Sequence, residues 1–173
     1  MHIDSRPPIP EQPTISDVYE WFGAASYAAQ VLEQSILNTL VVLDSNGRSV
    51  SETDWADFYQ RYDRKTLGQM LSKLKLKHDL PDGFELLLDS ALDERNRLCH
   101  HFFADNSEAF LFPAGRKRMI EDLSTMMSLY WKADGITEKV FDFHRRALGI
   151  TEERIEELMQ MALGEHLKKH VNG

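Results

Sequence analysis

Hydrophobic residues recur at intervals of three and four positions along most of this chain, the spacing that places side chains on one face of an α-helix. The first such run extends from about residue 17 to residue 43, contains no proline, and is preceded by Ser16, which we expect to be its N-cap. Turn residues at 44–49 end it. Its expected buried positions include Val18, Phe22, Ala25, Leu32, Ile36, Leu40 and Leu43.

Similar patterns predict further helices, and no stretch alternates in the manner of a strand. The expected helices cover residues 51–63, 65–78, 84–103, and 116–133 with a continuation past Gly135 to Leu148, followed by a last helix that begins at Thr151. We expect an irregular connector at 104–115. The predicted fold is therefore an all-α, single-domain bundle of about five to six helices over residues 16–170, preceded by a proline-rich disordered arm at 1–15.

Composition limits the class of protein. The 173 residues are 42% hydrophobic and 28% charged, which is ordinary for one soluble domain. The N-terminus lacks the apolar segment of a secretory signal, and no apolar run approaches the ~20 residues of a membrane span. Cys99 is the single cysteine, which excludes an internal disulfide and a multi-cysteine zinc site. These features predict a cytoplasmic protein without a membrane association, a metal site or a cofactor motif.

The net charge of −8 argues against general coating of nucleic acid, because non-specific binding to phosphate is largely a cationic effect. It leaves room for a local basic site. The segment SALDERNRLCHHFF at 90–103 carries such a cluster, with Arg95, Arg97, His100 and His101.

The helical period separates these four residues. At about 100° per residue, Arg95 falls in the middle of an arc of apolar side chains, whereas Arg97 and His101 fall on the opposite, polar side, where we expect them to be solvated. A guanidinium on an apolar face needs a partner, since an unpaired buried charge costs several kcal/mol. Three partners remain open: a carboxylate such as Glu33, a second protomer, or a phosphate.

His100 lies on the border of the apolar arc, four residues after Asn96, whose amide can hydrogen-bond the imidazole. An Arg-Asn-His set of this kind suits metal-independent RNA cleavage. A histidine can move the proton of the attacking 2′-hydroxyl, and an arginine can stabilise the charge that develops on phosphate oxygens. One helix supplies only one histidine, so a two-fold dimer with facing helices would complete the set.

The sequence RNRLCH at 95–100 resembles the R-x4-H motif of the HEPN superfamily (higher eukaryotes and prokaryotes nucleotide-binding domains), in which a polar residue directly follows the arginine. The long first helix with Glu33 and the TLGQML segment at 66–71 are also similar to that family. The resemblance spans about residues 16–130, and its specific part is six to nine residues around the motif.

The resemblance implies an all-α domain that dimerises through the motif helices, and in many members an endoribonuclease of the toxin, phage-defence or RNA-processing type. Arg95 would contact the phosphate, His100 would be the acid–base residue, and Asn96 would orient or polarise the site. A subgroup paired with nucleotidyltransferase antitoxins has R-x4-H-x-Tyr, and here Phe102 occupies the tyrosine position.

Other partners and alternatives remain open. Arg116, Lys117 and Arg118 form a short basic cluster that could hold RNA backbone. The rival to a ribonuclease is a non-catalytic helical interaction module in which Arg95 is structural. A third alternative is a regulatory or antitoxin-like subunit, and a ribonuclease could itself have an antitoxin or regulatory partner.

Overall fold

The structure of the protein, a computed structural model, describes residues 8–44, 60–62, 65–77, 80–147, 149 and 151–153. These residues form an all-α bundle and contain no strand. Its elements are α1 (Ile15–Asp44), α3 (Leu67–Lys77), α4 (Phe84–His100), the short α5 (Phe102–Asp105), the 3-10 helix η1 (Ala109–Leu111) and α6 (Pro113–Ala147). The all-α prediction is confirmed. The predicted helices at 51–63 and after Thr151 lie almost entirely outside the described residues.

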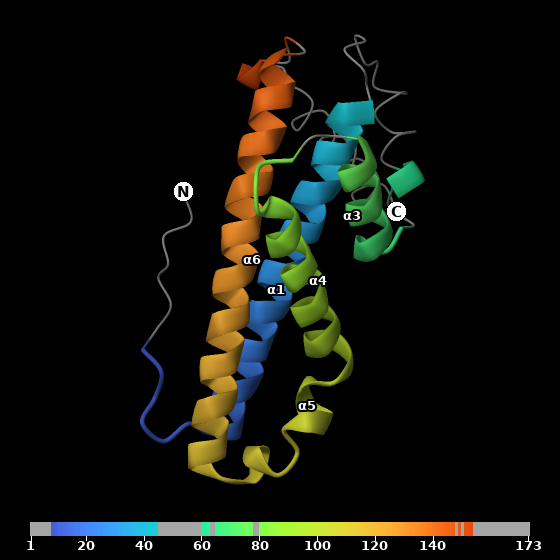
Figure 1. Cartoon of the computed structure of the whole chain (residues 1–173). Helices are drawn as coiled ribbons and strands as arrows, with labels where there is room; N and C mark the ends of the chain where they lie inside the picture. The colour runs from blue at the N-terminus through green and yellow to red at the C-terminus, as the bar shows by residue number, and fades with distance from the viewer. Residues whose placement is uncertain are drawn as a thin grey trace, which may run out of the picture.

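Two long helices form the framework of the bundle (Figure 1). Helix α1 has 30 residues and α6 has 35, so they are about 45 and 53 Å long at 1.5 Å per residue. They lie side by side and run in the same direction, with the start of one beside the start of the other. Ser35 in the middle of α1 donates a hydrogen bond to Asp134 in the middle of α6, which agrees with a parallel register.

The shorter helices pack on this pair. Helix α4 runs antiparallel to α1 and α6, and α3 lies beside it (Figure 1). The buried side chains of all these helices belong to one hydrophobic cluster. The apolar residues of α3 lie on one buried stripe, at Leu67, Met70, Leu71 and Leu74. The core positions expected for the first helix are all buried except Phe22, which packs partly buried against the cluster.

Helix α1 begins at Ile15, two residues earlier than expected, because Thr14 rather than Ser16 caps it. The backbone N–H of Asp17 donates to Thr14 Oγ1 at 3.2 Å, and the N–H of Thr14 donates to the Asp17 carboxylate at 2.6 Å. This reciprocal capping satisfies two N–H groups that an open helix end would leave free. The hydrogen bonds from Thr14 also lower the pKa of Asp17. Of the predicted arm, residues 8–14 are described, and there Pro13 is buried and Ile9 packs against the core.

The predicted helix at 84–103 is interrupted at His101, which takes φ −127° and ψ −21°. The interruption turns the chain so that Phe102 and Phe103 meet Phe22 of α1, with ring centroids 5.8 and 4.9 Å away. Apolar contact with α1 therefore overrides the helical period at this point. The connector that we expected to be irregular contains α5 and η1, and α6 begins at Pro113 and continues unbroken through Gly135.

Gly115 allows η1 to lie against the first turn of α6. A Cβ at this position would stand 2.0 Å from the carbonyl oxygen of Ala109, a backbone atom that cannot move away cheaply. A Cβ on Gly135, in the same helix, would meet nothing within 4 Å. The two glycines therefore form a matched pair for a stability test.

We expect Gly115→Ala to lower the free energy of unfolding by roughly 1–3 kcal/mol, because overpacking forces the backbone to shift. Gly135→Ala should raise it by roughly 0.5–1 kcal/mol, the gain usual for alanine over glycine inside a helix. Urea denaturation followed by circular dichroism measures both. Equal unfolding midpoints for Gly115→Ala and the wild type would contradict the close approach of η1 to α6.

Candidate functional site

Arg95 projects from α4 toward α1 and pairs there with Glu33, the carboxylate that the sequence suggested. Its Nη2 lies 3.5 Å from Glu33 Oε2, and each of the two side chains is 29% exposed. At that distance the contact is an ion pair without a hydrogen bond. Within the described part of the chain the other donors of the guanidinium have no partner, so Arg95 is held by one long contact and can still bind an anion.

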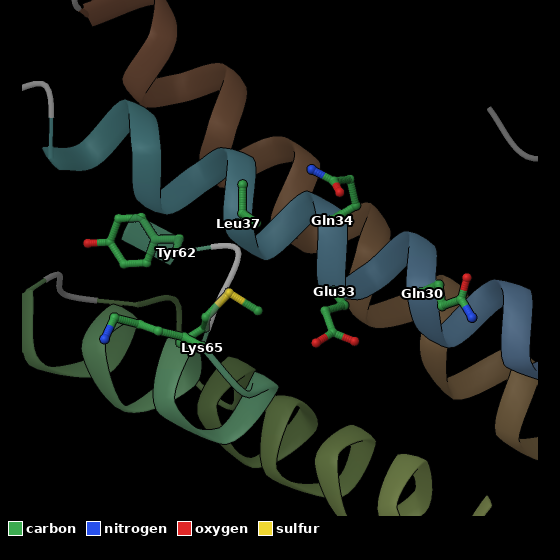
Figure 2. Close-up of a pocket in the computed structure, with 7 residues that line it drawn as sticks. Gln30, Glu33, Gln34, Leu37, Tyr62 and Lys65 are labelled. Atoms are coloured by element: carbon green, nitrogen blue, oxygen red, sulfur yellow. The ribbon is translucent and has the colours of Figure 1, made fainter. Parts of the chain in front are cut away.

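Glu33 also lines a hollow of about 250 Å³ between α1 and the segment that leads into α3. Figure 2 shows the Glu33 carboxylate projecting from α1 into the space between α1 and the helices α3 and α4. Tyr62 closes one side, and its hydroxyl donates a hydrogen bond to Asp44 at the end of α1. Burial is the main cause that raises the pKa of Tyr62 above its usual range. The ion pair thus borders open space.

Asn96 and His100 lie on the outer face of α4, and both are exposed. Within the described residues neither side chain forms a hydrogen bond or an ion pair, although the ring of His100 lies edge-on to that of His101, with centroids 6.3 Å apart. The amide–imidazole hydrogen bond that the spacing allows is therefore not formed. Arg95 and His100 are five residues apart and point about 140° apart around the helix, so one protomer does not bring them together.

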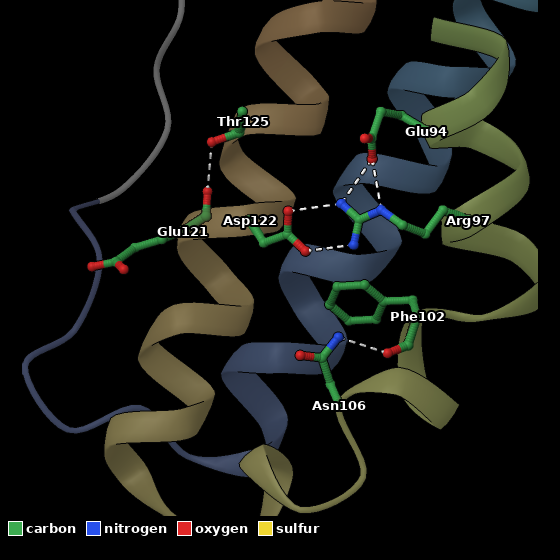
Figure 3. A network of polar contacts seen from close by, with 7 residues as sticks. All are labelled: Glu94, Arg97, Phe102, Asn106, Glu121, Asp122 and Thr125. Carbon is green, nitrogen blue, oxygen red and sulfur yellow. Dashed lines mark hydrogen bonds and ion pairs between the residues drawn. The ribbon is translucent and has the colours of Figure 1, made fainter. Parts of the chain in front are cut away.

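Arg97 corrects the prediction from the helical period. Instead of facing water, it joins α4 to α6 through two parallel hydrogen bonds to Asp122, each 2.8 Å long (Figure 3). Its Nε donates a third, of 2.9 Å, to Glu94, and the Arg97 side chain is 32% exposed. The hydrogen bonds with Asp122 are the largest cause that raises the pKa of Arg97 still further above neutrality. The guanidinium is permanently charged, and each of its three nitrogens is engaged within the protein.

The sequence pattern missed this arrangement because the helical period gives the angle of each side chain around its own helix and not the positions of the neighbouring helices. Helix α6 lies over the flank of α4 that carries Glu94 and Arg97, so this flank is only partly open to solvent. Asp122 is one acidic residue among 28 in the chain, and nothing in its spacing singles it out. Charge complementarity across the two helices could be found only with both helices in place.

Tyr130 of α6 is fully buried, and its hydroxyl is the only buried side-chain polar atom without a hydrogen-bond partner in the described part of the protein. Burial is the largest cause that raises the pKa of this phenol above its usual range, and the charge of Glu94 raises it further. A buried hydroxyl without a partner destabilises the fold, because it has lost its hydrogen bond with water.

The basic cluster at the start of α6 does not present three equivalent cations. Arg116 is occupied with the fold: its Nε donates to the carbonyl of Pro13 at 2.6 Å and its Nη1 to the carbonyl of Phe110 at 3.0 Å. It thereby ties the residues before α1 and the end of η1 to α6. Lys117 is half-buried, and only Arg118 is exposed.

No helix among the described residues is both long and apolar enough to cross a bilayer. Nor do three His, Cys, Asp or Glu side chains gather there in a group that could hold a metal ion. Comparison of the chain with protein-family models, with curated proteins and with solved structures finds no match.

The two arginines of α4 should differ in their effect on stability. We expect Arg97→Ala to lower the free energy of unfolding by roughly 1.5–3 kcal/mol, the range for hydrogen bonds to charged groups. Arg95→Ala should cost less than about 1 kcal/mol, as for a largely solvated single ion pair. Parallel urea titrations of the two variants test the difference, and equal losses would contradict the assignment of Arg97 as the structural arginine.

Tyr130→Phe should leave the free energy of unfolding unchanged or raise it by up to about 1 kcal/mol, because it removes a polar group without a partner and conserves the ring. Thermal unfolding followed by circular dichroism measures this change as a shift of the melting temperature. A lower melting temperature would show that the hydroxyl has a partner. Tyr62→Phe is the matched control and should be destabilising, since it removes the hydrogen bond to Asp44.

Proposed function

We propose that the protein is a metal-independent endoribonuclease of the HEPN type, with a site composed of Arg95, Asn96 and His100 from two copies of the chain. The single observation that carries the proposal is the contrast between the two arginines of α4. All three nitrogens of the Arg97 guanidinium contact two carboxylates, whereas that of Arg95 has one contact of 3.5 Å and keeps its other donors for an anion. The motif resemblance selects the same arginine.

The exposed face of α4 supports a composite site. The face is formed by Asp89, Ser90, Asp93, Asn96, Cys99 and His100, which are all exposed, although Lys75 of α3 reaches its beginning and forms an ion pair with Asp89. Because Arg95 and His100 point about 140° apart, they approach one phosphate more readily when each comes from a different protomer. A two-fold axis across this face would bring two copies of Asn96 and His100 into one cleft, which each Arg95 would approach from the flank that faces α1. The dimer through the helix at 84–103 is part of the proposal.

The reaction is a transesterification, in which the phosphorus atom exchanges its bond to the 5′-oxygen for a bond to the neighbouring ribose 2′-oxygen. The 2′-oxygen attacks phosphorus as the neutral imidazole of one His100 takes the hydroxyl proton. The P–O5′ bond breaks, and the protonated His100 of the second copy gives its proton to the leaving oxygen. Arg95 stabilises the charge on the non-bridging oxygens, and Asn96 orients the phosphate or the imidazole. The products are a 2′,3′-cyclic phosphate and a 5′-hydroxyl.

A second candidate function follows from the ion pair itself. Arg95 and Glu33 join α4 to α1, and an arginine engaged in this way suits a non-catalytic interaction module whose α4 face binds a protein partner. The two functions differ in what Arg95 does. In the module it contributes to folding, and in the ribonuclease it acts on the substrate.

Purified wild-type protein should cleave single-stranded RNA in the presence of EDTA and leave 2′,3′-cyclic phosphate ends. We expect Arg95→Ala and His100→Ala to lower the rate by about 10²–10⁴-fold each, the contribution usual for acid–base catalysis and for charge stabilisation. Their melting temperatures should stay close to that of the wild type. His101→Ala is the control, because this neighbouring imidazole is exposed and lies outside the motif.

RNA left intact by well-folded wild-type protein would overturn the catalytic proposal. A monomer in sedimentation equilibrium at the concentrations used for cleavage would overturn the composite site. If Arg95→Lys lowered stability and had no effect on cleavage, the structural role of Arg95 in an interaction module would be favoured.

A further inference from the structure

His100 is the last residue of α4, and the chain leaves the helix at His101. The imidazole of His100 is exposed, and within the described residues no hydrogen bond holds it. Its direction therefore depends on the backbone of the last helical turn. A helix end frays unless side chains or the surrounding fold hold it.

Arg97 holds this turn in two ways. Its carbonyl oxygen accepts the N–H of His101 at 2.9 Å, which closes the helix. Its guanidinium binds both carboxylate oxygens of Asp122 on α6 at 2.8 Å. Leu98 and Phe102 also bury the turn, but apolar burial is non-directional, whereas two parallel hydrogen bonds fix an orientation.

We propose that Arg97 and Asp122 are positioning residues of the site: their paired hydrogen bonds fix the last turn of α4 on α6 and thereby the direction in which His100 projects. This inference rests on the proposed ribonuclease function, although the anchoring of the helix can be measured without it. Arg95 and Arg97 then have separate tasks on one helix, the first toward the substrate and the second toward the fold.

The chain offers a matched control in a second ion pair of α4. Lys75 of α3 binds Asp89, which lies three turns before His100, about 16 Å along the helix axis. Like the Arg97–Asp122 pair, it joins α4 to a neighbouring helix. It anchors the other half of α4 and should have no influence on the direction of His100.

The experiment compares the full-length wild type with Asp122→Asn and Lys75→Met. Hydrogen exchange at the amide of His101 reports on the last turn, and the kinetics of RNA cleavage report on the site. For Asp122→Asn we expect exchange at His101 to accelerate by at least about tenfold and kcat to fall about 10–100-fold, as a displacement of about 1 Å can produce. KM should stay within about twofold, because Arg95 is untouched. Lys75→Met should change neither measurement.

Arg97→Lys serves as a milder second variant if Asp122→Asn does not fold. It keeps the charge but loses the two parallel bonds, so it should shift both measurements in the same direction by less. Exchange at His101 and kcat that both remain at the wild-type values would overturn the positioning role while the ribonuclease function stands. Equal effects of Asp122→Asn and Lys75→Met would also overturn it. A wild type that cleaves no RNA would instead refute the proposed function, and exchange at His101 would still show whether Asp122 anchors the turn.

Discussion

The parallel packing of α1 against α6 determines where every other described element lies. Two parallel helices require the chain to return along the bundle between them, and α4 makes most of that return in the opposite direction (Figure 1). The hydrogen bond from Ser35 to the buried Asp134 favours one register of the long pair, since a buried carboxylate without a partner is costly. The motif helix consequently lies along two neighbours at once, with Glu33 of α1 on one flank and Asp122 of α6 on the other.

This position explains why two arginines only two residues apart have different surroundings. A step of two residues turns the side chain by about 200° around the helix, so a helix packed on two neighbours presents one arginine to each. The partner on α6 offers a carboxylate in line with the guanidinium, and a second carboxylate, Glu94, stands on the same helix. The partner on α1 offers a single oxygen at 3.5 Å beside an open hollow. Arg97 is therefore held firmly on the flank that faces α6, whereas Arg95 on the flank that faces α1 keeps donors available to an anion.

Much of the fold could be predicted from the sequence because helical periodicity depends on local spacing. The stripe of α3, the length of α1 and the continuity of α6 through Gly135 follow from it. The period also identified Arg95 as an arginine in need of a partner, and Glu33 as a candidate. It failed where tertiary contacts decide. His101 interrupts the helix so that two phenylalanines reach α1, Thr14 replaces Ser16 as the cap, and Asp122 turns a supposedly solvated Arg97 into an anchor.

Because the chain is acidic, its capacity to bind phosphate depends on which of its cations are not already paired within the fold. With a net charge of −8, RNA approaching this protein meets a repulsive surface, and each cation used within the fold is lost to phosphate binding. Arg97 and Arg116 are used in this way, the first by two carboxylates and the second by two backbone carbonyls. Along α4 only Arg95 retains free donors. In the proposed ribonuclease, α4 of one protomer offers a single arginine with free donors to the RNA, and pairing two α4 faces would supply a second one. Under the proposed function, dimerisation would therefore add positive charge against the acidic surface as well as complete the catalytic set.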